Sequence, residues 1–155
     1  MKRSVEPFTL PKKLERDLAR ALSFWEGLKR REAKIPFWDD VNISALPDLS
    51  RRLAMIEVTE MPARFRFGFG VVGDEINKHY GADLAGKFFD EIEVRHPLQL
   101  LVSQCSATLE TSKPTYYRHR AASKHFYSRL LLPLWGNGRI GMLLAAFAWE
   151  QESAG

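Results

Sequence analysis

Two long apolar runs near the C-terminus, joined by a short polar turn, constrain the fold of this chain more than any other feature. The runs cover residues 126–134 and 139–149, and the turn between them contains Asn137-Gly138. An Asn-Gly pair between two such runs is a strong hairpin signal, because both residues readily take the positive φ angles that a two-residue turn needs. The sequence therefore predicts two adjacent antiparallel strands at the end of the chain.

The remaining elements place helices in the middle of the chain and strands on both sides of them. Patterning predicts further strands at 52–60, 65–72 and 115–121. A short helix is expected at 74–80, and Pro97 is expected to open a longer one. Because strands and helices do not alternate regularly, this order favours an α+β fold with an antiparallel five-stranded sheet.

A helix is predicted at the N-terminus, from Pro11 to about Glu32, and a connecting segment follows it to residue 49. The apolar residues of this helix recur at intervals of four and three: Leu14, Leu18, Ala21, Trp25 and Leu28. The stripe spans two heptads, which is too short to hold a coiled coil alone. It packs either on the chain's own domain or against a second copy as a dimer interface, and both can hold. The chain thus divides into 1–49, a domain at 50–150 and a tail at 151–155.

The stretch Gly68-Phe69-Gly70-Val71-Val72-Gly73 matches the glycine pattern of a dinucleotide-binding loop. However, phenylalanines alternate with other residues straight through it, as they do in a strand with one core-facing side. We therefore interpret these residues as strand and turn glycines. Glycines inside a strand often mark the close approach of another segment. We expect that segment to be the N-terminal helix of the same chain or of a dimer partner.

Composition narrows the classes of function. The chain has 155 residues and one cysteine, Cys105, so it can form no intrachain disulfide and no multi-cysteine metal site. The N-terminal residues lack a signal-peptide core, and no apolar run has the length of a membrane span. We expect a cytoplasmic protein without membrane contact. The net charge of +4 comes from segments where acidic residues are interleaved, which argues against a nucleic-acid partner.

Residues 65–92 and 126–147 form two ordered motifs. The first, FRFGFGVVGDEINKHYGADLAGKFFDEI, combines a strand, a short helix and a G-x-D-L-x-G-K turn; the second, FYSRLLLPLWGNGRIGMLLAAF, combines a strand ending in Pro-Leu, an Asn-Gly hairpin and a final strand. Together they resemble the PAS sensory domain family, in particular bacterial single-domain PAS-like proteins. The resemblance covers roughly residues 50–150, and the N-terminal helix matches a helical extension that such domains often carry.

The resemblance implies a five-stranded antiparallel sheet of strand order 2-1-5-4-3, with helices packed over one face around a small cavity. Part of the predicted cavity lining comes from the strand at 65–72, the two central helices and the strand at 115–121. The rest follows from the resemblance, because the last two strands of the family turn one face toward the cavity. The predicted ligand-binding residues are Phe67, Phe69, Ile76, Tyr80, Leu101, Cys105, Tyr117, His119, Tyr127, Arg129, Leu131 and Leu143.

Arg129 is the unusual member of this set, because a charged side chain is costly to bury without a partner. If it points inward, its guanidinium is suited to grip a carboxylate or a phosphate. The alternative is that Arg129 lies at a strand edge or pairs with an acid such as Glu57.

Known PAS cofactors find little support in the sequence. The flavin photosensors of the family carry a reactive cysteine in an N-C-R-F-L-Q stretch, which is absent, and Cys105 reads as a small buried hydrophobe. No C-x-x-C-H motif for covalent haem is present. His79, His96, His119 and His125 could each ligate haem, but scattered histidines are more often surface or capping groups. No metal-ligand pattern is found either.

We therefore expect a non-enzymatic PAS-like sensory module that binds a small molecule in an apolar pocket. It would act as a homodimer through an unidentified effector protein. Two alternatives stay open: a ligand-free dimerisation or adaptor domain with a filled core, and an α+β cone-shaped enzyme of small molecules. The enzyme would require an Asp–His pair inside the cavity.

Overall fold

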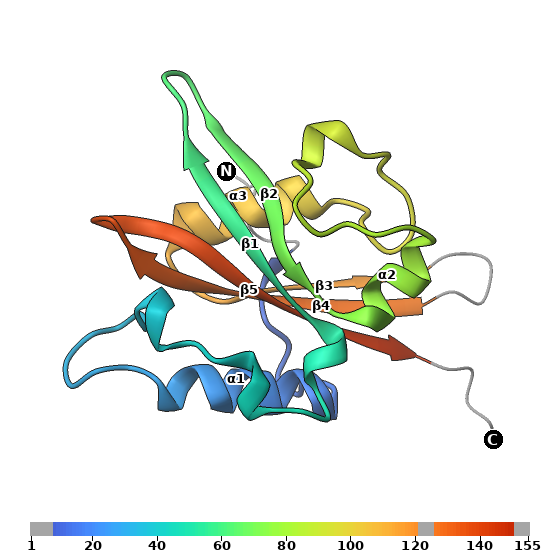
Figure 1. Ribbon diagram of the computed structural model, residues 1–155. Helices are drawn as coiled ribbons and strands as arrows, with labels where there is room; N and C mark the ends of the chain where they lie inside the picture. The colour runs from blue at the N-terminus through green and yellow to red at the C-terminus, as the bar shows by residue number, and fades with distance from the viewer. Residues whose placement is uncertain (1–7, 121–125, 151–155) are drawn as a thin grey trace.

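The computed structural model describes residues 8–120 and 126–150, and within this part five strands form one open antiparallel sheet (Figure 1). The strand order is β2-β1-β5-β4-β3, as the sequence led us to expect. The strands are β1 (Leu53–Glu60), β2 (Phe65–Val72), β3 (Thr115–His119), β4 (Phe126–Gly136) and β5 (Arg139–Glu150).

Three α-helices and four short 3-10 turns complete the described part of the chain. The helices are α1 (Arg16–Gly27), α2 (Asp74–Tyr80) and α3 (Leu101–Thr111). The 3-10 turns are η2 (Trp38–Asp40), η3 (Ile43–Ala45), η4 (Ser50–Arg52) and η5 (Phe89–Glu91). The α+β class is confirmed.

The β4–β5 hairpin forms where the sequence predicts it and lies inside the sheet. Asn137 and Gly138 have φ angles of 58° and 77°, and Gly136 pairs with Arg139 across the turn. Since β5 also pairs with β1, this hairpin joins the N-terminal and C-terminal strands into one sheet.

The sheet is covered on both faces, and each face has its own hydrophobic cluster. Figure 1 shows α1 on one side of the sheet and α2 and α3 on the other. Leu18, Ala21 and Trp25 of α1 pack against residues of β4 and β5 such as Leu132 and Leu144. We refer to the two sides as the α1 face and the α3 face.

The N-terminal helix is shorter than predicted, because it begins at Arg16 rather than near Pro11 and ends at Gly27. The residue before it, Glu15, is held by tertiary contacts: its carboxylate accepts hydrogen bonds from the hydroxyls of Tyr116 and Ser128. These bonds fix Glu15 in an extended conformation at the helix N-cap, so the chain enters the helix one turn later than Pro11 suggests.

The longer central helix also begins later than predicted, at Leu101 instead of Pro97. The carbonyl oxygens of Pro97 and Gln99 are engaged by Arg129 on β4, which holds this segment outside the helix. Leu100 lies at the helix N-cap with a φ angle of 58°, an unfavourable backbone conformation for leucine. The third strand ends at His119, and the predicted end at Ala121 lies outside the described residues.

The glycine-rich stretch is part of β2, which confirms the strand interpretation. The expected neighbour was wrong, however, since a Cβ on Gly68 would meet the Phe88 ring at 3.0 Å and one on Gly70 would meet the Glu57 carboxylate at 3.1 Å. Neither position faces α1. The predicted core-facing set is buried only in the middle of β2, at Phe67 and Phe69, whereas Phe65 and Val71 are exposed.

Residues 86–88 lie along the free side of β2 and hydrogen-bond to it. The amide of Phe69 donates to the carbonyl of Lys87, and the amide of Gly86 donates to the carbonyl of Phe69. Gly68 and Phe88 form an antiparallel bridge. A side chain at Gly68 would therefore push this segment away.

Candidate functional site

Arg129 is the largest fully buried side chain in the described part of the chain, and it lies on the α3 face of β4. The guanidinium is directed toward α3 and the segment that precedes it, so the inward orientation holds. The alternative partner Glu57 is exposed and lies beside Gly70 instead.

The guanidinium of Arg129 donates only to neutral oxygens among the described residues. Its Nε donates to Oε1 of Gln104 at 2.8 Å and its Nη2 donates to the carbonyl of Gln99 at 2.8 Å. Its Nη1 donates to the carbonyl of Pro97 at 3.0 Å. Nε and Nη2 form the side of the guanidinium that binds a carboxylate through two parallel hydrogen bonds. Here that side holds one amide oxygen and one peptide oxygen.

Aromatic rings surround the guanidinium. Its central carbon lies 5.0 Å from the ring centre of Tyr117 and 5.9 Å from that of Tyr127. Burial lowers the pKa of Arg129, although the nearby tyrosines favour its charged form. Burial also raises the pKa of Tyr127 to about 12, against the opposing effect of the Arg129 charge. The aromatic rings and the neutral oxygens thus compensate, in part, for the missing counterion.

A chain of buried polar side chains extends from Arg129 along α3 to β3. Gln104 donates through Nε2 to Oγ1 of Thr115 at 3.2 Å, and the hydroxyls of Thr115 and Thr108 lie 2.7 Å apart. Gln104 and Thr108 were not among the residues predicted from the sequence. A signal existed, because both share the helix face of Leu101 and Cys105 at spacings of three and four residues.

The predicted ligand-binding residues are brought together, but they fill the α3 face instead of lining an open cavity. Nine of them form one hydrophobic cluster. These are Phe67, Phe69, Ile76, Tyr80, Leu101, Cys105, Tyr127, Leu131 and Leu143. Tyr117 packs on the cluster, while half-buried His119 bonds to the Tyr117 hydroxyl at 2.8 Å and stacks on Tyr127. Burial, with help from the Arg129 charge, lowers the pKa of His119.

Cys105 is fully buried in this cluster, as expected of a small hydrophobe. Burial raises the pKa of its thiol to about 12, although the charge of Arg129 works in the opposite direction. A thiol with such a pKa is almost entirely protonated near neutral pH and is a poor nucleophile.

The predicted dimer stripe packs within its own chain. Leu18, Ala21 and Trp25 have exposed fractions of 0%, 0% and 2% in the single chain. Trp25 also donates its Nε1 hydrogen to the carbonyl of Pro133 at 2.8 Å. Leu14 packs at the margin of the same cluster, and Leu28 is half-buried. Three of the five side chains therefore have no surface left for a second copy.

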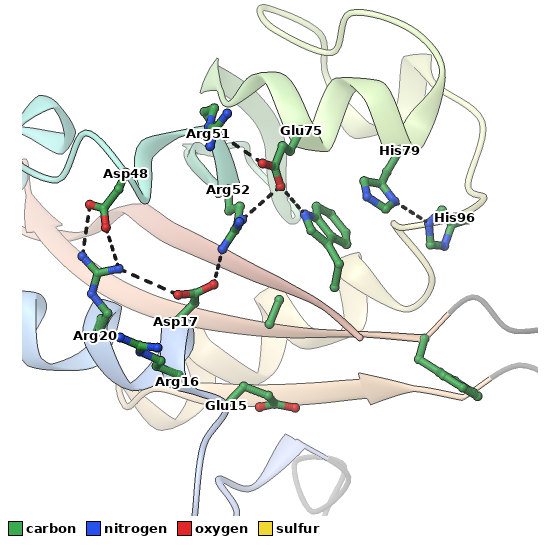
Figure 2. A pocket seen from close by; sticks show the side chains of 13 residues that line it. Glu15, Arg16, Asp17, Arg20, Asp48, Arg51, Arg52, Glu75, His79 and His96 are labelled. Atoms are coloured by element: carbon green, nitrogen blue, oxygen red, sulfur yellow. Dashed lines mark hydrogen bonds and ion pairs between the residues drawn. The ribbon is translucent and has the colours of Figure 1, made fainter. Parts of the chain in front are cut away.

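A charged cleft lies across one end of the sheet, between α1, α2 and the segment before β1 (Figure 2). Its volume is about 900 Å³. Figure 2 shows acids and arginines alternating across it, from Asp48 through Arg20, Asp17 and Arg52 to Glu75. Glu75 links this chain of ion pairs to β5, because its carboxylate also accepts a hydrogen bond from Nε1 of Trp149 at 2.8 Å.

These contacts determine the acidity of Glu75. Burial by itself would raise the pKa of this carboxyl, but the hydrogen bonds from Arg52 and Trp149 and the arginine charges outweigh burial and lower the pKa. The cleft therefore fastens α1 and α2 to the sheet through partly exposed ion pairs. Its acids and arginines alternate, so it offers no surface of one charge to a ligand.

His79 and His96, two of the four histidines considered as haem ligands, contact each other in the lining of this cleft. Nδ1 of His79 and Nε2 of His96 are 3.2 Å apart, and the ring of His79 stacks on Trp149 with ring centres 3.7 Å apart (Figure 2). His125 lies outside the described residues. Within residues 8–120 and 126–150, no group of three or more histidine, cysteine, aspartate or glutamate side chains could hold a metal ion.

A search for a membrane-spanning segment covered the same residues and found no helix that is both long and apolar enough. Comparison with protein-family models, with curated proteins and with solved structures found no match. The fold and the geometry of the chain itself are therefore the basis of the functional proposal.

Proposed function

We propose that the chain is a non-enzymatic, PAS-like signalling module that binds a small organic anion at Arg129 and acts through a partner protein. The observation that carries the proposal is a fully buried guanidinium whose carboxylate-binding side holds only two neutral oxygens. Removing a charge from water without a counterion costs several kcal/mol, roughly, even after relaxation. A ligand carboxylate would supply that counterion.

The surroundings indicate what kind of anion would fit. Tyr117, Tyr127, Leu131 and Cys105 offer rings and apolar groups around the guanidinium. A carboxylate attached to an aromatic or branched apolar group matches this environment better than a phosphate, whose higher charge needs more donors.

Binding at this place requires the protein to open, because the oxygens of Gln104 and Gln99 occupy the positions that the carboxylate would take. These two residues belong to α3 and to the segment before it. An anion would bind the open arrangement and not the closed one, and this difference in affinity would shift the equilibrium between them. The movement of α3 would be the signal that the partner protein reads.

The filled α3 face supports the second candidate, a ligand-free adaptor, because no ligand is needed to complete that core. The enzyme alternative has less support. Its requirement was an inward Asp–His pair, and the buried polar side chains of residues 8–120 and 126–150 are Gln104, Thr108, Thr115, Ser128 and Arg129.

Benzoate and benzyl alcohol form a matched pair of probes, since they share a ring and differ in charge. Thermal unfolding and calorimetric titration of the full chain should show that benzoate binds and stabilises the protein and that benzyl alcohol does not. Mass spectrometry of the protein as purified would reveal a bound acid.

Gln104→Glu is the decisive variant, because it places a carboxylate within the chain at the position where the ligand oxygen would bind. It should abolish benzoate binding while the protein stays folded. Arg129→Met should abolish it too. Benzoate binding that persists in both variants would overturn the proposal, and an absence of binding by the wild-type chain to any carboxylate would favour the adaptor.

A further inference from the structure

Exposed apolar side chains gather on one part of the surface beside α3. Among the described residues, seven large hydrophobic side chains are exposed, and four of them lie in this area. The four are Phe65 at 41%, Val94 at 65%, Leu100 at 51% and Val102 at 48%. Soluble proteins rarely expose such a cluster without a binding role.

Three adjoining grooves are found at the same place, and Val102 lines all of them. The central groove, of about 210 Å³, is lined by apolar residues such as Ile92, Leu98 and Leu100. The second runs toward Arg66 on β2 and toward Arg64, which precedes that strand, and the third runs toward Glu110 on α3. We name this surface of three grooves the Val102 face.

We propose that the Val102 face is an interface between two copies of this chain. The first argument is its size. The residues that line the three grooves approach the lower end of the roughly 20–30 residues per side of a standard interface, with an apolar centre and a polar rim. The central groove is too small for more than one or two side chains. The exposed Leu100 and Val94 at its walls have side chains of that size, which can enter the same groove of a second copy.

The second argument is the distribution of charge. A two-fold axis lying in the interface brings opposite ends of the same surface into contact. With the axis passing near Val102, the Arg64 end of one copy meets the Glu110 end of the other. Arg66 is already paired with Asp90 of its own chain, so the opposite charges that meet are those of Arg64 at one end and Glu110 at the other. Glu110 also has an interaction within its own chain, and the proposal requires only that its charge lies at this rim.

Leu100 adds a third argument. It holds its exposed side chain at the centre of the face from a backbone with a φ angle of 58°, which is unfavourable for leucine and suits glycine or asparagine. Folding alone would favour one of those residues here. A leucine at this position is explained if its side chain packs against a second molecule, because that contact offsets the unfavourable backbone conformation.

The proposal replaces the expected dimer interface on α1, whose side chains are buried within the chain. It is independent of the anion site, because it requires no ligand. The two remain connected in space, since Leu98 and Leu100 of the face flank Gln99, whose carbonyl binds Arg129.

Sedimentation of the full chain over a range of concentrations tests the proposal. The wild-type chain should dimerise, and Val102→Glu should raise the dissociation constant by a factor on the order of ten or more, because it places a charge in the desolvated centre. Val71→Glu is the matched control. Val71 is also an exposed valine, but it lines none of the three grooves, so the control should dimerise normally.

Two further variants separate an interface role from a structural one. Leu100→Asn should keep or raise the unfolding temperature, since asparagine tolerates the backbone conformation, and yet weaken the dimer. Arg64→Glu should weaken the dimer, and adding Glu110→Lys should restore it. A monomer at all concentrations would overturn the proposal, as would a dimer that Val102→Glu and Leu100→Asn leave unchanged.

Discussion

The two faces of the sheet are built from different kinds of side chain. The α1 face is closed by leucine, alanine and tryptophan, and its buried polar group, Ser128, lies where Glu15 and Tyr116 reach it. The other four buried polar side chains of the described residues are Gln104, Thr108, Thr115 and Arg129, all on the α3 face. Burial of apolar surface, with Ser128 satisfied by Glu15 and Tyr116, explains the α1 face.

The α3 face contains groups that stability alone would not select. Three such features occur in α3 and its neighbours. They are the buried guanidinium of Arg129 without a counterion, the row of hydroxyl and amide groups beside it, and the exposed Leu100 with its positive φ angle. Departures from locally favourable choices are expected where a protein has a function to perform. The comparison teaches that the α1 face supports the fold and that function is to be sought on the α3 face.

Introducing charge on the α1 face should have the largest effect. Leu18→Glu combined with Trp25→Glu buries two unpaired charges at about several kcal/mol each, which is comparable to the whole stability of a typical domain, about 5–15 kcal/mol. We expect loss of the folded state, measured by circular dichroism. Ala19→Glu, on the exposed side of the same helix, should leave the protein folded. A folded monomer from the double variant would contradict the structural role of this face.

Thiol labelling should reveal how often the α3 face opens. Because the pKa of Cys105 is raised from 9.0 to about 12, its thiolate fraction is roughly a thousandfold lower than that of an ordinary thiol. Iodoacetamide should therefore label Cys105 of the folded chain near neutral pH at least a thousandfold more slowly than Cys105 of the chain unfolded in urea. The rate is measured from the intact mass. The chain has no other cysteine, so the reading is unambiguous. Native labelling as fast as in urea would mean that the α3 face is open in solution.

Acidification should produce the smallest effect, at the cleft that joins the two faces. The pKa of Glu75 is lowered in the folded chain, so its contribution to stability is present above its usual pKa of 4.5 and is lost as the pH falls through the folded value. Glu75→Gln should be less stable than the wild type by up to about 1 kcal/mol near neutral pH. Urea unfolding at decreasing pH should show this difference closing. A constant difference would assign it to the Trp149 hydrogen bond instead.

The parts of the fold that sequence analysis predicted correctly depend on local rules. The bounds of β2 and α2 follow from residues that act on their neighbours: a period of two through Phe67 and Phe69, and Gly81, which ends α2 with a φ angle of 94°. The β4–β5 hairpin follows from Asn137-Gly138 in the same way. The strand order came from resemblance to a family and is the order observed.

The errors arise where a distant residue overrides the local rule. Glu15 is held by Tyr116 and Ser128 from the other end of the chain, and this delays α1. Arg129 likewise holds the segment before α3 out of the helix. The filled state of the site could not be predicted either, because it depends on Gln104 reaching Arg129 across 25 residues of sequence.

The bonding of residues 86–88 to β2 has a consequence for how molecules of this protein meet. An edge strand with free amide and carbonyl groups is a template for another strand, and long runs of such pairing lead to fibres. Here the middle of the β2 edge is already occupied, with the guanidinium of Arg66 lying 3.4 Å from the ring of Phe88 above it. The opposite edge, β3, has five residues. Because β2 is partly covered and β3 is short, the chain can present the Val102 face to one partner copy without also pairing strands at its sheet edges.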